Sequence, residues 1–127
     1  MNKKYIISLD GNRIGTTNFE KADAPMGVVM GLISFETIDS PYIYFLNYCK
    51  NNNIKITEND PDLECIFTQS IEGLKVFNET GIEIKGVGAN IYAFKDDGYY
   101  IDVFGIPYPF YEEEFPHHRE AYEKQFS

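Results

Sequence analysis

Three pairs of short β-type segments, each joined by a tight turn that contains glycine, constrain the fold of this chain more than any other feature. Asp, Asn and Gly tolerate the positive φ that a tight hairpin turn requires. The pairs and their turns are residues 5–9 and 13–17 around Asp10-Gly11-Asn12, residues 74–78 and 82–84 around Glu79-Thr80-Gly81, and residues 91–95 and 99–104 around Asp96-Asp97-Gly98. The pattern predicts three antiparallel hairpins.

The remaining periodic segments predict one further strand and two helices. Residues 26–35 are apolar and rich in Val and Ile, with Gly27 and Gly31 interrupting them, which favours a buried or bulged strand. A helix is expected over about 41–52, capped by Ser40, with an apolar stripe formed by Tyr42, Phe45, Leu46 and Cys49. A second helix is expected at the C-terminal end, over about 116–126. Residues 1–127 therefore predict a single α+β domain, an antiparallel or mixed sheet built from hairpins with the two helices packed on it.

The charge balance excludes several classes of partner. Twenty acidic residues against eleven basic ones give a net charge of -9, which disfavours direct nucleic-acid binding and favours a basic partner.

No apolar run approaches the length that crosses a bilayer, so no membrane role is expected. Lys3 and Lys4 precede an apolar run, residues 5–9, that is too short for a signal peptide, and only two cysteines occur. We therefore expect a cytoplasmic protein with free thiols.

The groups that could bind a metal or a cofactor do not have the required spacing. His117 and His118 are adjacent, so on a helix they diverge by about 100°, and the chain has no third histidine beside Glu112, Glu113 and Glu114. The carboxylates of residues 58–64 lack the glycine of a calcium-binding loop and predict a solvated loop. Gly86-Val87-Gly88 begins like a dinucleotide fingerprint, but a strand pattern follows it. We expect no metal and no cofactor.

No catalytic residue emerges either. Cys49 lies on the apolar stripe of its predicted helix, so a buried and unreactive thiol is expected there. Carboxylate pairs such as Asp96 and Asp102 arise by chance in a chain with this many acidic residues. The sequence therefore favours a protein that is not an enzyme.

Aromatic residues are concentrated between Tyr99 and Phe115, among acidic residues. Strand alternation buries only about half of such rings against one core, so some rings should lie on a second surface. Tyrosine anchors beside acidic side chains suit binding to a basic protein. The predicted partner-binding residues are Asp96, Asp97, Tyr100, Asp102, Tyr108, Tyr111, Glu112, Glu113 and Glu114. The alternative for these rings is a second packed layer, or a homodimer contact.

Three segments give the chain a resemblance to the small stand-alone acidic proteins of bacteria, of the toxin-immunity type. These segments are Leu9-Asp10-Gly11 with Ile14-Gly15, residues 22–29, and residues 105–112. The resemblance implies a non-enzymatic acidic binding protein, an immunity protein that neutralises a basic toxin domain such as a nuclease. The alternatives are a small-molecule-binding or enzymatic α+β domain with a pocket at the glycine-rich strands, and a structural homo-oligomeric protein.

Overall fold

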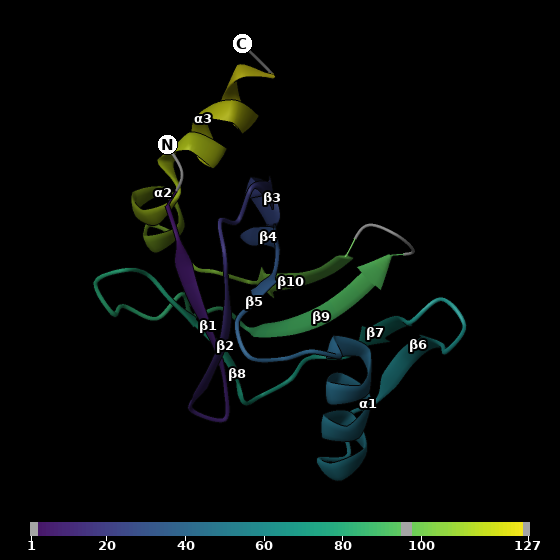
Figure 1. Cartoon of the computed structure of the whole chain (residues 1–127). Coiled ribbons are helices and arrows are strands. Elements are labelled where there is room, and N and C mark those ends of the chain that lie inside the picture. The colour runs from purple at the N-terminus through teal and green to yellow at the C-terminus, as the bar shows by residue number, and fades with distance from the viewer. Residues whose placement is uncertain (1–2, 95–97, 126–127) are drawn as a thin grey trace.

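The computed structural model describes residues 3–94 and 98–125 and has an α+β fold with two antiparallel sheets. One sheet has the strand order β5-β2-β1-β8 and the other β3-β4-β10-β9-β7-β6. The strands are β1 Tyr5–Leu9, β2 Asn12–Thr17, β3 Lys21–Asp23, β4 Val28–Leu32, β5 Ser34–Phe35, β6 Ile56–Asp60, β7 Cys65–Thr68, β8 Leu74–Phe77, β9 Gly88–Phe94 and β10 Gly98–Phe104. The helices are the 3-10 helix η1 Ala24–Met26 and the α-helices α1 Pro41–Asn51, α2 Phe110–Glu114 and α3 Pro116–Lys124 (Figure 1).

The first and third predicted hairpins are confirmed. β1 pairs antiparallel with β2, and the turn residues Asp10 and Gly11 have φ values of 51° and 83°, as the turn chemistry requires. β9 pairs antiparallel with β10, and of the third predicted turn only Gly98 belongs to the described residues. The second hairpin is incomplete: beyond the turn only a single bridge, from Phe77 to Glu83, joins the returning chain to β8.

The prediction of one strand over residues 26–35 is wrong, because the segment divides between the two sheets. Met26 ends η1, β4 joins the six-stranded sheet and β5 joins the four-stranded sheet. Gly27 makes the turn from η1 into β4 with a φ of 65°, at a point where a Cβ would lie 2.6 Å from the Ile106 carbonyl oxygen. Glycine is thus required there by both conformation and space.

The sequence also predicts a solvated loop over residues 58–64, and this prediction is wrong in part. Glu58 and Asp60 lie in the edge strand β6, which pairs with β7, while residues 61–64 form the turn. Their charge suits an edge strand, because exposed carboxylates discourage pairing with another chain.

The inserted helix is confirmed as α1, and Tyr42, Phe45 and Cys49 of its predicted stripe are buried. Ser40 precedes the helix but makes no side-chain capping bond. The C-terminal helix, α3, begins at Pro116 as predicted, yet none of its residues is buried; it contacts the edge strand β3 and otherwise extends away from the sheets (Figure 1). The short helix α2 was not predicted, and it places residues 110–114 directly against the core.

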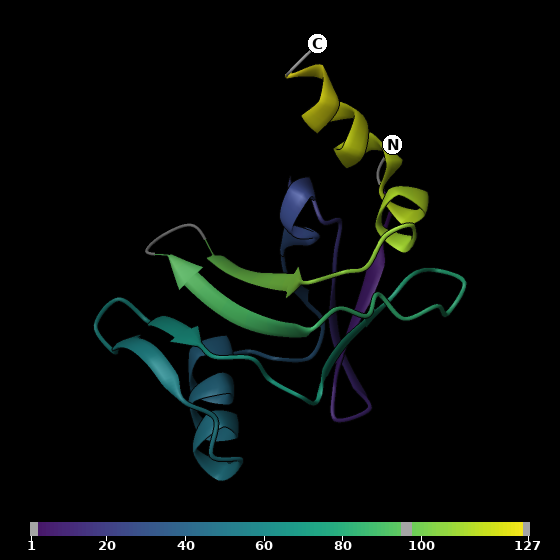
Figure 2. The ribbon, with the colours of Figure 1, turned by 180° about the vertical axis from the view of Figure 1, so that it is seen from behind.

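The core lies between the two sheets, and α1 closes one end of it. Along β10 the side chains of Ile101 and Val103 point into this core, whereas the alternate residues Tyr100 and Asp102 lie on the opposite, outer face. Figure 2 views the six-stranded sheet from the side opposite α1, and no helix of the described chain covers β9 and β10 on that side. The fold therefore leaves one sheet face and one helix without an internal covering layer.

Candidate functional site

The structure separates the seven predicted partner-binding residues that it describes instead of gathering them on one surface. Asp96 and Asp97 lie outside the described residues. Tyr100 and Asp102 lie on the outer face of β10. Tyr108 precedes α2, and the remaining four residues, 111–114, belong to α2 itself. Each group is surrounded by a different set of neighbours.

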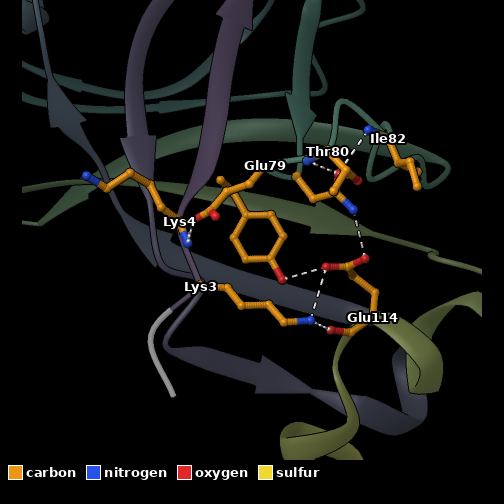
Figure 3. Close-up of polar contacts among 8 residues, drawn as sticks. Lys3, Lys4, Glu79, Thr80, Ile82 and Glu114 are labelled. Carbon is orange, nitrogen blue, oxygen red and sulfur yellow. Dashed lines mark hydrogen bonds and ion pairs between the residues drawn. The ribbon is translucent and has the colours of Figure 1, made fainter.

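Glu114 is bound within the protein, as Figure 3 shows. Its carboxylate accepts hydrogen bonds from the Tyr5 hydroxyl at 2.9 Å and from the Asn78 side-chain amide at 3.0 Å, and it pairs with the Lys3 ammonium at 3.5 Å. Lys3 also donates to the Glu114 carbonyl oxygen at 3.1 Å. Only 12% of the Glu114 side chain is exposed. The carboxylate thus joins β1, the turn after β8 and α2, and it is not offered to a partner.

Tyr111 is also part of the interior. Its side chain is fully buried, its hydroxyl donates to the Val28 carbonyl oxygen at 2.9 Å, and its ring centroid lies 5.4 Å from that of Phe115. Burial raises the pKa of the Tyr111 hydroxyl. The predicted role of Tyr111 as a surface anchor does not fit this position, although the ring supports its neighbour Tyr108.

Tyr108 is exposed and yet held at several points. Its side chain is 42% exposed, while its hydroxyl donates to the Ala24 carbonyl oxygen at 2.9 Å. The ring stacks on Tyr111 with 5.3 Å between centroids, and the Arg119 guanidinium lies 5.6 Å from the Tyr108 ring centroid. A ring fixed in this way loses little conformational freedom when a partner covers it.

Acidic and apolar side chains surround Tyr108. Glu112 and Glu123 both pair with Arg119, the latter at 2.5 Å, and both lie close enough to Tyr108 to raise its hydroxyl pKa, a smaller effect than burial. We define the Tyr108 surface as Asp23, Met26, Tyr108, Glu112, Glu113 and Tyr122. Met26 is 67% exposed, and Asp23 and Glu113 are exposed as well. α3 contacts both η1 and β3, so these elements form one continuous region.

The two histidines next to this surface have structural neighbours. His118 Nε2 lies 2.7 Å from the Phe19 carbonyl oxygen, and the His117 and His118 ring centroids are 4.0 Å apart. Burial, and then the neighbouring His118, lower the pKa of His117. Among residues 3–94 and 98–125, no three His, Cys, Asp or Glu side chains gather closely enough to hold a metal ion.

The outer face of β9 and β10 carries a second cluster. The rings of Tyr92 and Tyr100 stack with 5.4 Å between centroids, and Phe67 lies 5.9 Å from Tyr92. The Tyr92 hydroxyl hydrogen-bonds to the Asp102 carboxylate, but the Oδ1 atom of Asp102 is buried and has no hydrogen-bond partner in the described structure. Burial raises the pKa of Asp102 to about 6.

Two grooves lie on other sides of the molecule. One, of about 900 Å³, runs beside the β1–β2 turn and is lined by groups that include Asp10, Tyr48, Glu72 and Lys75. Burial, followed by the Asp10 side chain, raises the pKa of Tyr48 to about 12. The other, of about 340 Å³, follows the glycine-rich residues 83–89. A depression therefore lies where the alternative small-molecule hypothesis expects one.

The cysteines offer no activated nucleophile. Both are free thiols, Cys49 is buried, and Cys65 donates to the Ala93 carbonyl oxygen at 3.2 Å. Burial raises the pKa of both thiols, which lowers the thiolate fraction at neutral pH.

Sequence reasoning missed residues that complete both clusters. Asp23, Met26 and Tyr122 reach the Tyr108 surface through contacts between distant parts of the chain, which no local pattern reports. Tyr92 could have been found, because strand alternation along the predicted hairpin puts it on the same sheet face as Tyr100, which it stands opposite on β9 and β10.

Comparison of this chain with protein-family models, curated proteins and solved structures returns no match. In addition, no helix in the described part of the chain has the length and apolar character needed to span a membrane.

Proposed function

We propose that this chain is a non-enzymatic binding protein whose Tyr108 surface binds a basic protein, in the manner of a bacterial immunity protein that neutralises a toxin domain. The observation that carries the proposal is Tyr108 itself. A tyrosine that is 42% exposed and held by a hydrogen bond, a stacked ring and a guanidinium is a preorganised anchor.

Charge complementarity favours a basic partner. The chain carries a net charge of -9, and exposed carboxylates occur on the elements next to the anchor: Asp23 precedes Ala24, whose carbonyl oxygen Tyr108 contacts, and Glu113 lies in α2. Exposed charges of this kind chiefly accelerate encounter, whereas a buried ring chiefly slows dissociation. The two classes of side chain on the Tyr108 surface therefore predict separate kinetic effects.

A second candidate function is small-molecule binding, and the groove of about 900 Å³ beside the β1–β2 turn favours it. Its polar lining carries both signs of charge, with Asp10 and Glu72 against Arg13 and Lys75. Arg13 is already engaged, because its guanidinium donates to both carboxylate oxygens of Glu36 at 2.7 and 2.8 Å. A copurified metabolite in this groove would support this candidate.

The test uses the partner captured from the source cells by crosslinking, with association and dissociation rates measured at low and high salt. Asp23→Lys combined with Glu113→Lys should slow association several-fold and weaken its salt dependence. The matched control is Glu58→Lys combined with Asp62→Lys, which makes the same charge change on exposed side chains at and near β6.

Tyr108→Ala should act on dissociation instead. Loss of an anchor ring costs on the order of 2 kcal/mol, which is about a thirtyfold faster dissociation, with the salt dependence kept. If the control pair slows association as much as the Asp23 and Glu113 pair, only net charge matters and the proposed surface is wrong. A Tyr108→Ala variant with unchanged dissociation contradicts the proposal as well.

A further inference from the structure

The outer face of the six-stranded sheet carries partly buried aromatic and polar side chains, although no second layer from residues 3–94 and 98–125 covers it. Tyr100 and Asp102 on β10 stand opposite Tyr92 and Asn90 on β9, and β4 contributes Met30 next to Asp102. All five side chains are partly buried. This is the face seen in Figure 2. Aromatic side chains on a solvent-facing sheet surface suit recognition of a ligand.

A cation of the protein itself already lies on this face. The Lys21 ammonium of β3 lies 5.1 Å from the centroid of the Tyr100 ring, within the range of a cation–π contact. No ion pair within 4.0 Å joins Lys21 to Asp102 among the described residues. The Tyr100 ring therefore already accommodates a positive group, and that group forms no ion pair with the Asp102 carboxylate.

Asp102 lacks the partners that a buried carboxylate ordinarily has. The Tyr92 hydroxyl donates a hydrogen bond to the Asp102 carboxylate, but the Oδ1 atom has no hydrogen-bond partner among the described residues. An unsatisfied buried polar atom lowers stability, so its presence calls for an explanation such as a ligand. Burial and then Asp102 raise the pKa of Tyr92, and Glu20 makes a smaller contribution in the same direction. Glu20 is therefore close enough to add negative potential to this face.

We propose that this outer face is a binding site for a guanidinium group, presented by an arginine of the basic partner, which takes the place of the Lys21 ammonium over the Tyr100 ring and donates to the carboxylate of Asp102. A guanidinium offers a flat face for stacking and a planar set of N–H donors along its edge, so it meets both requirements at once. Met30 and Lys21, both flexible side chains, stand beside the site and can move aside as the group enters.

The position of this site agrees with the proposed function, on which the identity of the partner rests. β3 contributes Lys21 to the outer face and Asp23 to the Tyr108 surface. A protein interface buries roughly 800 Å² on each partner, so one partner can cover both regions. The site itself is tested without that partner.

The experiment is a titration of the full chain with the peptide acetyl-Gly-Arg-Gly-amide, followed by amide chemical shifts in NMR spectra at physiological salt. We expect saturable, millimolar binding with shifts concentrated on β9, β10 and β3. The matched peptide replaces arginine with citrulline, which has the same shape and no charge, and it should bind at least about fivefold more weakly. This comparison uses the unmodified protein, so no variant needs to fold.

Three variants locate the site. Asp102→Asn should weaken binding of the arginine peptide about fivefold and Tyr100→Leu about threefold. Lys21→Met should tighten it about twofold, because the internal cation no longer competes for the ring. Asp62→Asn, a matched charge change on the exposed turn after β6, should leave binding unchanged. Equal binding of the citrulline peptide, equal losses in Asp102→Asn and Asp62→Asn, or no saturable binding would each overturn the proposal, whatever partner the Tyr108 surface binds.

Discussion

At the scale of single residues, Glu114 and Asp102 are both withdrawn from solvent but differ in their hydrogen-bond partners. Glu114 receives donors from three other residues, whereas one oxygen of Asp102 receives none. A satisfied carboxylate stabilises the fold, and an unsatisfied one costs stability. The two residues should therefore respond in opposite directions when their charge is removed.

Glu114→Gln should lower the free energy of unfolding by about 1–3 kcal/mol. The amide cannot form an ion pair with the Lys3 ammonium, and it offers one acceptor oxygen where the carboxylate accepts from both the Asn78 amide and the Tyr5 hydroxyl. Urea denaturation of the variant and the wild type measures the difference. Glu113→Gln is the control, because this neighbouring side chain is exposed and its replacement should cost less than about 0.5 kcal/mol. Equal effects at the two positions would contradict the structural role of Glu114.

Asp102 should make stability depend on pH in a particular direction. Burial raises its pKa from 3.8 to about 6 in the folded chain. The folded state therefore binds the proton more tightly than the unfolded state, and the stability contributed by this group is full below about pH 4 and is lost as the pH rises through about 6.

Asp102→Asn removes that titration. The variant should gain about 1 kcal/mol relative to the wild type between about pH 4 and pH 7.5, since the wild type alone must ionise a buried carboxylate. Denaturation midpoints of both proteins at the two pH values provide the measurement. A difference that is the same at both pH values would show that Asp102 does not titrate in this way.

At the scale of elements, α1 and α3 represent opposite cases of helix stabilisation. α1 places Phe45, which is fully buried, against Phe35 and Tyr99 with ring centroids 6.0 and 6.3 Å away. α3 has nine residues and buries none of them. A helix of this length is marginal on its own in water, so α3 depends on its contacts with α2, η1 and β3 and on any partner.

Substitutions in α1 should follow this difference in burial. Phe45→Ala should cost about 3–5 kcal/mol, and Leu46→Ala about 1–2 kcal/mol, because Leu46 is only partly buried. Ser40→Ala should cost less than about 0.5 kcal/mol, since the hydroxyl makes no capping bond. Chemical denaturation of the three variants checks the order. A loss at Leu46 as large as that at Phe45 would show that the orientation of the helix is wrong.

The elements that local chemistry determines were predictable from the sequence. The β1–β2 turn and the apolar stripe of α1 each depend on residues close together in the chain. The division of residues 26–35 between two sheets was not predictable, because β4 pairs with β10 some seventy residues later. β6 was missed because its charges and the following Pro61 resemble a loop, whereas pairing with β7 decides its conformation.

The candidate sites were predictable to a smaller extent. Local sequence placed Tyr108 and Glu113 among acidic and aromatic neighbours, which the structure retains. The sequence could not show that Tyr111, unlike these two residues, is buried, because the ring points into the core only through the formation of the five-residue helix α2. Nor could it bring η1 to Tyr108, since the bond from Tyr108 to Ala24 spans 84 residues.

At the scale of the whole molecule, β3 connects the two proposed binding regions, and the larger groove lies elsewhere. The Tyr108 surface occupies η1, α2 and α3, the guanidinium site occupies β9 and β10, and β3 borders both. The groove of about 900 Å³ lies beside the β1–β2 turn and α1. A protein partner and a small molecule would therefore protect different parts of the chain.

Hydrogen–deuterium exchange of the chain, alone and in complex with the captured partner, tests the central claim most directly. Amides in unburied helices and loops exchange quickly until a partner covers them. We predict slower exchange in residues 105–109, in η1 and in α3, with no change in the turn at residues 61–64. Slower exchange confined to the β1–β2 turn and the end of α1, with α3 unchanged, would contradict a binding role for the Tyr108 surface.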